Sequence, residues 1–235
     1  MLSIIIPCYN ESANLPTLAQ KCVELLKSNS DVEIILVDNG SKDDSKSILN
    51  NLININSDVN LKTVHVETNI GYGFGILSGL NAASGEVLCW THADLQTDIF
   101  DCVKAFNIWN VEKKDFTLVK GKRRGRGLFD VFFTFSMQVY VFIKLHVMLN
   151  DINGQPKLFS KKFFELIKTD APNDFSLDLY FLFKASKIGK IVEFPVYFSQ
   201  RLAGEAKGGS GNLNLKLKLT KRTLSFINDI SKKSL

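Results

Sequence analysis

Short runs of apolar and β-branched residues alternate with helix-forming segments through the first half of this 235-residue chain. The runs at 2–6, 33–37 and 87–90 predict strands that are buried on both faces. Helix-spaced apolar residues follow the first two runs, at 15–26 and 45–53. Because strands that alternate with helices form βαβ units, we expect an α/β fold with a central, mostly parallel sheet. Further strands are predicted at 62–66, 116–119, 152–159 and 191–197, with a helix at 213–230.

The positive charge of the chain is concentrated near its carboxyl terminus. The net charge is +5, but residues 201–235 hold eight basic and two acidic residues, against 21 and 22 in the first 200. The hydrophobic fraction of 45% excludes a disordered chain. In the apolar segment 128–149, the charge-free part 131–143 is shorter than the ~20 residues that span a bilayer. The chain is therefore expected to be soluble or peripheral to a membrane, and four cysteines without paired spacing favour the cytoplasm.

Carboxylates follow two of the predicted strands, at the edge of the sheet where ligands bind in parallel α/β folds. Asp38 comes directly after the strand 33–37, and Asp94 follows the strand 87–90. The first can accept hydrogen bonds from a ribose or a base, and the second can ligate a hard divalent cation that neutralises a diphosphate. Gln96 adds a possible carbonyl ligand. Alternatively, both aspartates only cap the helices that follow.

A basic run lies immediately before the apolar segment 128–149. It consists of Lys120, Lys122, Arg123, Arg124 and Arg126. We favour contact with phosphates and lipid headgroups over a solvated charge run, because an apolar stretch follows directly. Nucleic-acid binding is not expected, since no aromatic interleaving or nucleic-acid motif accompanies these cations. The apolar segment itself fits either a buried helix or helix pair, or an interfacial helix.

Two further features permit more than one interpretation. Asp174 and Asp178 are four residues apart on a predicted helix and therefore on one face of it. One of them could be a general base, or they could cap the N-terminus of this helix. A lipid phosphate acceptor would need no strong base, because it is already anionic near neutral pH. The glycines at 71, 73 and 75 do not form a P-loop. They indicate either a close approach of the backbone to a ligand or a turn that enters a helix.

Four motifs resemble those of the family 2 glycosyltransferases: IIIPCYNESANL, IILVDNGSKDDS, NIGYGFGILSGLNAASGE and WTHADLQTD. The similarity continues through VKGKRRGRG, DINGQPKLFSKK and FPVYFSQRLAGEAKGG, roughly over residues 1–210. It is greatest to the dolichyl-phosphate mannosyltransferases and other polyprenyl-phosphate sugar transferases. The resemblance implies a GT-A fold, a nucleotide-sugar-binding α/β sandwich, over residues 1–211. Within it, 128–149 would be a helical segment on the acceptor side, and 212–235 would form a basic helical tail.

The resemblance also implies a role for each matching residue. It assigns the donor nucleotide to Pro7, Tyr9, Glu11, Asp38, Asn39, Gly73, His92 and Ala93. It assigns a divalent metal, Mn²⁺ or Mg²⁺, to Asp94, Gln96 and His92. It assigns donor or acceptor phosphates to Arg123, Arg124, Arg126, Arg201 and Lys207. It implies Asp94 and Arg201 in catalysis, and Asp178 is a further catalytic candidate as the possible general base described above.

The chain departs from the family pattern at three of these motifs. Asn39 replaces the second Asp of the usual Val-Asp-Asp, and Ala206 replaces a frequent Ser in the R-x-x-G-x-[SA]-K motif. His92 replaces the first Asp of the D-x-D motif, and a neutral imidazole suits Mn²⁺ better than Mg²⁺. The substitution at His92 supports the alternative that the chain is a non-catalytic module, which only binds a nucleotide sugar.

The function implied is transfer of a sugar, with inversion, from a nucleotide-diphosphate sugar to a polyprenyl phosphate at the inner membrane face. A saccharide acceptor in cell-surface polysaccharide synthesis is the alternative. The expected partners are therefore a nucleotide sugar, one of these acceptors and an anionic membrane surface.

Overall fold

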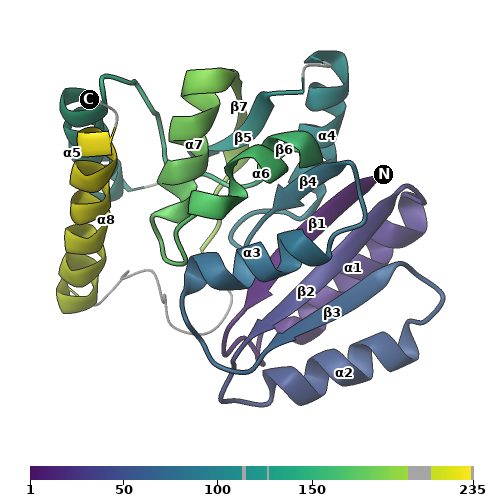
Figure 1. Cartoon of the computed structure of the whole chain (residues 1–235). Helices are drawn as coiled ribbons and strands as arrows, with labels where there is room; N and C mark the ends of the chain where they lie inside the picture. Colours follow the sequence, from purple (N-terminus) through teal and green to yellow (C-terminus); the bar gives the residue numbers. More distant parts are fainter. Residues whose placement is uncertain (113–114, 126, 201–212, 234–235) are drawn as a thin grey trace.

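The computed structural model describes residues 1–112, 115–125, 127–200 and 213–233 (Figure 1). Its centre is a seven-stranded sheet with the order β3-β2-β1-β4-β6-β5-β7. The strands are β1 (Leu2–Cys8), β2 (Val32–Asn39), β3 (Leu61–Val66), β4 (Val87–Trp90), β5 (Thr117–Arg124), β6 (Lys157–Ser160) and β7 (Lys190–Tyr197). Only β6 runs antiparallel to its neighbours β4 and β5. The α/β class and the mostly parallel sheet are therefore confirmed.

Helices cover both faces of this sheet (Figure 1). They are α1 (Leu15–Ser28), α2 (Ser45–Ile55), α3 (Tyr72–Ala82), α4 (Phe100–Glu112), α5 (Leu128–Leu145), α6 (Lys161–Ile167), α7 (Leu177–Ile188) and α8 (Leu213–Lys233), with a 3₁₀ turn at Lys168–Asp170. Side chains of α1, α2 and α4 share one apolar core with one face of the sheet. Those of α3, α5, α6, α7 and α8 share a second core with the other face. The result is a three-layer sandwich.

The predicted strand at 152–159 is wrong in its first half, because β6 begins only at Lys157. The preceding residues form a turn in which the backbone N–H of Gly154 donates to the carbonyl of Asp151 at 2.8 Å. The carboxylate of Asp151 in turn accepts from the backbone N–H of Arg123 at 2.8 Å. The Asp151 side chain therefore ties this turn to β5, and the strand β6 begins only after the turn.

The start of α3 packs directly against the segment that leads into α7. A Cβ on Gly71 would lie 2.2 Å from the carbonyl oxygen of Asn173, and a Cβ on Gly73 would lie 2.5 Å from that of Pro172. Neither position can carry a side chain without separating the two segments. These glycines thus bring the 172–174 segment close to the carboxyl edge of the sheet.

The basic helix α8 lies along α5 (Figure 1). Ile227 of α8 is fully buried in the second core. The Tyr140 hydroxyl donates to Asn228 Oδ1 at 3.1 Å, and the Ser231 hydroxyl donates to the carbonyl of Lys144 at 3.0 Å. Among the helices that the structure describes, none is both long and apolar enough to cross a bilayer.

Candidate active site

A cavity of about 400 Å³ opens where the carboxyl ends of β1, β2 and β4 meet. Its size lies within the range of ordinary small-molecule sites. The residues around it come from distant parts of the chain and include Pro7, Tyr9, Glu11, Asn39, Asn69, Gly71, Tyr72, His92, Ala93, Asp94, Gln96, Thr97, Arg123, Asn153, Gln155, Asp174, Phe175, Asp178, Phe198 and Arg222. The cavity therefore lies at the sheet edge that the sequence indicates, and it unites most of the predicted site residues.

The loop after β4 directs three potential ligands into the cavity. Leu95 has a φ of 58°, a left-handed conformation that costs a leucine about 1–2 kcal/mol. This bend allows Asp94 and Gln96, on either side of it, both to line the cavity. The carboxylate Oδ1 of Asp94 accepts from the backbone N–H of Gln96 at 3.2 Å. The amide nitrogen of Gln96 donates to the carbonyl of Ser199 at 3.2 Å, which leaves its amide oxygen as a potential ligand.

His92 lies beside these two residues, and an aromatic side chain orients its ring. Its Nε2 lies 3.3 Å from the hydroxyl of Tyr72, whose ring stacks on Phe175 at 4.7 Å. When Nε2–H donates to this hydroxyl, the lone pair of Nδ1 stays available for a ligand. Burial raises the pKa of Tyr72, and Asp178 raises it further, so Tyr72 keeps its proton.

The donor set of this loop fits a divalent metal, with one carboxylate, one imidazole and one amide oxygen. Such a mixed nitrogen and oxygen set suits Mn²⁺ better than Mg²⁺. Across the described residues, no three His, Cys, Asp or Glu side chains gather into a complete metal site. Asp94, His92 and Gln96 could hold such an ion only together with oxygens of a bound ligand.

The end of β2 presents Asn39, and not Asp38, to the cavity. Asp38 is buried behind it, where its Oδ1 accepts from the backbone N–H of Ser41 at 3.0 Å and its Oδ2 lies 3.4 Å from Nδ1 of His65. The amide nitrogen of Asn39 donates to the carbonyl of Gly71 at 3.0 Å. An aspartate could not make this bond, which gives the substitution at this position a physical reason.

Two buried acceptor atoms at the cavity have no hydrogen-bond partner among the described residues. They are Oδ1 of Asn39 and Oε1 of Gln155, and both residues line the cavity. The amide nitrogen of Gln155 donates to Asp178 Oδ1 at 2.8 Å, which determines the orientation of its amide group. Because a buried acceptor without a donor is costly, these atoms indicate a ligand that brings hydroxyl or N–H groups.

Asp178 and Asp174 both line the cavity, but the prediction that they share a helix is wrong. The helix α7 begins at Leu177, and Asp174 lies in the turn before it. The Asp174 carboxylate accepts from the backbone N–H of Ser176 at 2.8 Å, a local bond that competes with helix formation. Asp178 forms a buried ion pair with Lys157 of β6. Burial lowers the pKa of Lys157, and the neighbouring Asp178 opposes this shift.

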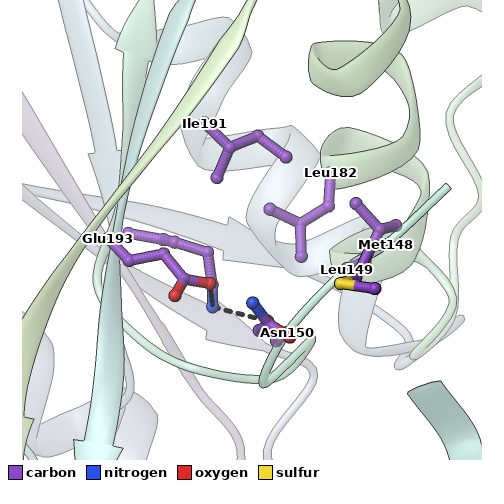
Figure 2. A pocket seen from close by; sticks show the side chains of 7 residues that line it. Met148, Leu149, Asn150, Leu182, Ile191 and Glu193 are labelled. Atoms are coloured by element: carbon purple, nitrogen blue, oxygen red, sulfur yellow. Dashed lines mark hydrogen bonds and ion pairs between the residues drawn. The ribbon is translucent and has the colours of Figure 1, made fainter.

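Most of the described cations of the basic run are held away from the cavity. The ammonium of Lys120 is buried, donates to the carbonyl of Asn150 at 2.8 Å and lies 3.4 Å from Glu193. Burial lowers the pKa of Lys120 to about 8, and Lys157 lowers it as well. Lys122 also pairs with Glu193, at 3.2 Å. Lys120 contributes instead to a second cavity of about 260 Å³ between β7, α7 and the 148–150 loop (Figure 2).

Arg123 is the member of the described basic run that lines the main cavity. Its Nε donates to Asp151 Oδ1 at 3.0 Å, and its guanidinium carbon lies 5.2 Å from the centre of the Phe198 ring. Burial alone would raise the pKa of Asp151, but the hydrogen bonds from Arg123 outweigh it and lower this pKa to about 2. Arg123 is thus rigidly held at the edge of the site.

The remaining predicted site residues divide into two groups. Asp38, Gly73 and Arg124 are not among the residues that line the cavity. Arg126, Arg201 and Lys207 lie outside the described residues. The structure also adds cavity residues that the motifs did not single out, above all Tyr72, Gln155 and Arg222. Tyr72 and Gln155 lie inside the quoted motifs NIGYGFGILSGLNAASGE and DINGQPKLFSKK, whereas Arg222 has no local signal.

Comparison with known proteins agrees with the motifs. A family model described as glycosyl transferase family 2 matches residues 3–163. The chain belongs to this family. A dolichyl-phosphate beta-glucosyltransferase of Dictyostelium discoideum is 30% identical over 129 residues, which are 52% of this chain and 39% of the relative. An undecaprenyl-phosphate 4-deoxy-4-formamido-L-arabinose transferase of Proteus mirabilis is 35% identical over 96 residues, 40% of this chain and 29% of the relative. The matches thus span less than half of either curated relative.

The fold of this family 2 chain is also found among solved structures. Glucosyl-3-phosphoglycerate synthase from Mycobacterium tuberculosis, in complex with Mn²⁺, UDP and glucosyl-3-phosphoglycerate, superposes with a TM-score of 0.70 at 16% identity. The match covers 96% of this chain and 79% of the other. The predicted GT-A fold and the predicted membership of family 2 are therefore confirmed.

Proposed function

We propose that this family 2 chain transfers a sugar from a nucleotide-diphosphate sugar to a polyprenyl phosphate, with inversion at the anomeric carbon. The observation that carries the proposal is the cavity at the sheet edge. It combines the Asp94 loop with two buried acceptor atoms, on Asn39 and Gln155, that have no hydrogen-bond donor among the described residues. A nucleotide sugar brings both a diphosphate and many hydroxyl and N–H donors.

The nucleotide is proposed to lie between the ends of β1 and β2. Pro7, Tyr9 and Glu11 line this side of the cavity. Oδ1 of Asn39 is proposed to accept a hydrogen bond from the base or the ribose. Asp38 is proposed to hold the turn that follows β2 in place, because its carboxylate accepts a hydrogen bond from the backbone N–H of Ser41.

Asp94, His92 and Gln96 are proposed to hold a divalent cation, Mn²⁺ in preference to Mg²⁺. When bound, this ion would neutralise charge that develops on the leaving nucleoside diphosphate. Arg123 is proposed to bind a phosphate at the same edge, since its guanidinium lines the cavity. Arg201 and Lys207 remain proposed phosphate ligands on the resemblance alone.

In the proposed reaction, an oxygen of the acceptor attacks the anomeric carbon as the bond to the diphosphate breaks. A phosphate acceptor is already anionic near neutral pH and needs no strong general base. The carboxylate of Asp178, held by Lys157 and Gln155, is proposed to stabilise positive charge on the reacting sugar carbon. With a hydroxyl acceptor, the same carboxylate would be the candidate general base.

An apolar stripe on α5 supports a lipid acceptor and a peripheral position at the cytoplasmic face of a membrane. Phe135, Val139, Phe142 and Ile143 share one face of the helix and are between 41% and 60% exposed. The exposed cation Lys144 adjoins this stripe. Apolar side chains beside a cation suit the surface of an anionic membrane. The two curated relatives, named for dolichyl and undecaprenyl phosphates, support the same acceptor class.

The test is consumption of UDP-glucose, UDP-N-acetylglucosamine or GDP-mannose by the purified chain, with Mn²⁺ or EDTA and with farnesyl phosphate as acceptor. We expect metal-dependent transfer from one donor. Asp94→Asn should lower turnover about 100- to 1,000-fold. The matched control is Asp58→Asn, which removes an exposed carboxylate that does not line the cavity and should leave turnover unchanged.

The alternatives predict different outcomes of this experiment. With a saccharide acceptor tested in parallel, transfer to the saccharide but not to farnesyl phosphate would support a role in polysaccharide synthesis. Binding of a nucleotide sugar without turnover, with any metal or acceptor, would instead show a non-catalytic module. Near-normal turnover of Asp94→Asn would remove this residue from its proposed role.

A further inference from the structure

Arg222 of α8 lines the candidate active-site cavity, although α8 is the last described helix of the chain. It is 128 positions after Asp94 in the sequence and belongs to a segment whose charge, by itself, indicates only a basic tail. Figure 1 shows α8 beside α5, on the side of the molecule where α7 lies. The tertiary fold therefore brings a cation from this segment to the substrate site.

The position of Arg222 is determined by packing on the next turn of α8. Phe226 is four residues further on and shares the same helix face. Its ring lies 6.3 Å from the ring of Tyr180, on the helix α7 that also carries Asp178. Ile227 is fully buried beside it. These contacts hold the helix against α7, so that Arg222 projects from an anchored backbone.

The charges around the cavity leave Arg222 available for a ligand. Of the described residues that line the cavity, two are cations, Arg123 and Arg222. Arg123 already binds the buried carboxylate of Asp151. Arg222 is exposed and forms no ion pair with any residue that the structure describes. A guanidinium is always charged, and its planar fork matches the oxygens of a phosphate.

We infer that Arg222 binds a phosphate group of a substrate, so that α8 forms one wall of the active site. The inference rests on the proposed function, which supplies two sources of phosphate: the diphosphate of the donor and the phosphate of the lipid acceptor. Both present the same chemistry to a guanidinium. The binding measurements below separate them.

Lys221 provides a matched control, because it is adjacent, cationic and exposed but does not line the cavity. The variants are Arg222→Gln, Arg222→Lys and Lys221→Gln in the full chain. Dissociation constants are measured for UDP and GDP with Mn²⁺ in one arm, and for farnesyl phosphate in the other. Binding to vesicles of phosphatidylcholine and phosphatidylglycerol is measured in parallel.

We expect Arg222→Gln to weaken binding at least about tenfold in one arm, which identifies the source of the phosphate. Arg222→Lys should retain part of the affinity, because it keeps the charge but loses the fork. Lys221→Gln should stay within about twofold of the wild type in both arms. The melting temperatures of all variants should agree, because both side chains are exposed.

Three results would overturn the inference. The first is unchanged affinity of Arg222→Gln in both arms, and the second is an equal loss for Lys221→Gln, which would show a general effect of charge. The third is a loss of vesicle binding alone, which would make Arg222 a membrane contact. A wild-type chain that binds neither nucleotide nor farnesyl phosphate would overturn the proposed function first, and this inference with it.

Discussion

The ion pair between Lys157 and Asp178 is the most consequential buried contact at the candidate active site. Its side chains are 0% and 4% exposed. The ammonium also donates to the carbonyl of Gly154 at 3.1 Å and lies 5.6 Å from the centre of the Trp90 ring. Removing one partner of such a pair leaves a buried charge and costs about 3–5 kcal/mol. Asp178→Asn should therefore lower the melting temperature by about 6–20 °C in a domain of this size.

The loss in Asp178→Asn should also depend on pH. Burial lowers the pKa of Lys157 in the folded protein, and Asp178 opposes that shift. Without the carboxylate this pKa falls further, whereas the unfolded lysine keeps its ordinary value. Between the two values the unfolded state binds more protons, so stability rises with pH. Relative to wild type, Asp178→Asn should regain stability as pH rises from the folded-state Lys157 pKa of the variant to that of the wild type.

The assay is urea unfolding followed by circular dichroism over a series of pH values below the ordinary pKa of lysine. Lys157→Met and the double variant Lys157→Met/Asp178→Asn complete a cycle, in which we expect coupling of at least about 2 kcal/mol. The control is Asp115→Asn, which breaks an exposed pair with Lys162 and should cost less than about 1 kcal/mol. If each single variant costs under about 1 kcal/mol and the two costs add in the double variant, the argument that burial couples these two charges strongly is refuted.

Two further perturbations follow from the structure. Because the pKa of Asp151 is lowered from 3.8 to about 2, its contribution is complete above about pH 4 and is lost as pH falls towards 2. Asp151→Asn should thus cost about 2 kcal/mol at pH 7 and almost nothing at pH 2 in thermal unfolding, and a pH-independent cost would contradict this pKa. Replacing Phe142 and Ile143 with serine should weaken binding to anionic vesicles roughly 30-fold, or about 2 kcal/mol, with only a small fall in the melting temperature. Unchanged vesicle binding would disprove contact between this stripe and lipid.

The sheet could be predicted because each buried parallel strand is a local run of apolar residues. The runs at 2–6, 33–37 and 87–90 all form strands in the structure. The position of Asp94 at the sheet edge follows directly, because it is four residues beyond β4. The strand predicted at 152–159 was wrong at its start, since the bond between Asp151 and the distant Arg123 has no trace in the local pattern.

The basic run illustrates the limit of local reasoning about charge. Successive side chains of β5 point to opposite faces of the sheet, so Lys120 and Arg123 have different surroundings. Lys120 is buried beside Glu193, which lies on the neighbouring strand β7. No property of the five cations themselves predicts that partner. Burial and pairing depend on the strand order, which places β7 next to β5.

The sequence by itself determined the α/β class, the family and the presence of Asp94 and His92 after the fourth strand. Periodicity and motifs are local properties, so neighbouring residues suffice to show them. Only the tertiary structure decided that Asn39 faces the cavity while Asp38 is buried behind it, and that Arg222 reaches the same site. Access to a ligand depends on burial and on charge pairing between residues far apart in the chain, and folding alone brings these together.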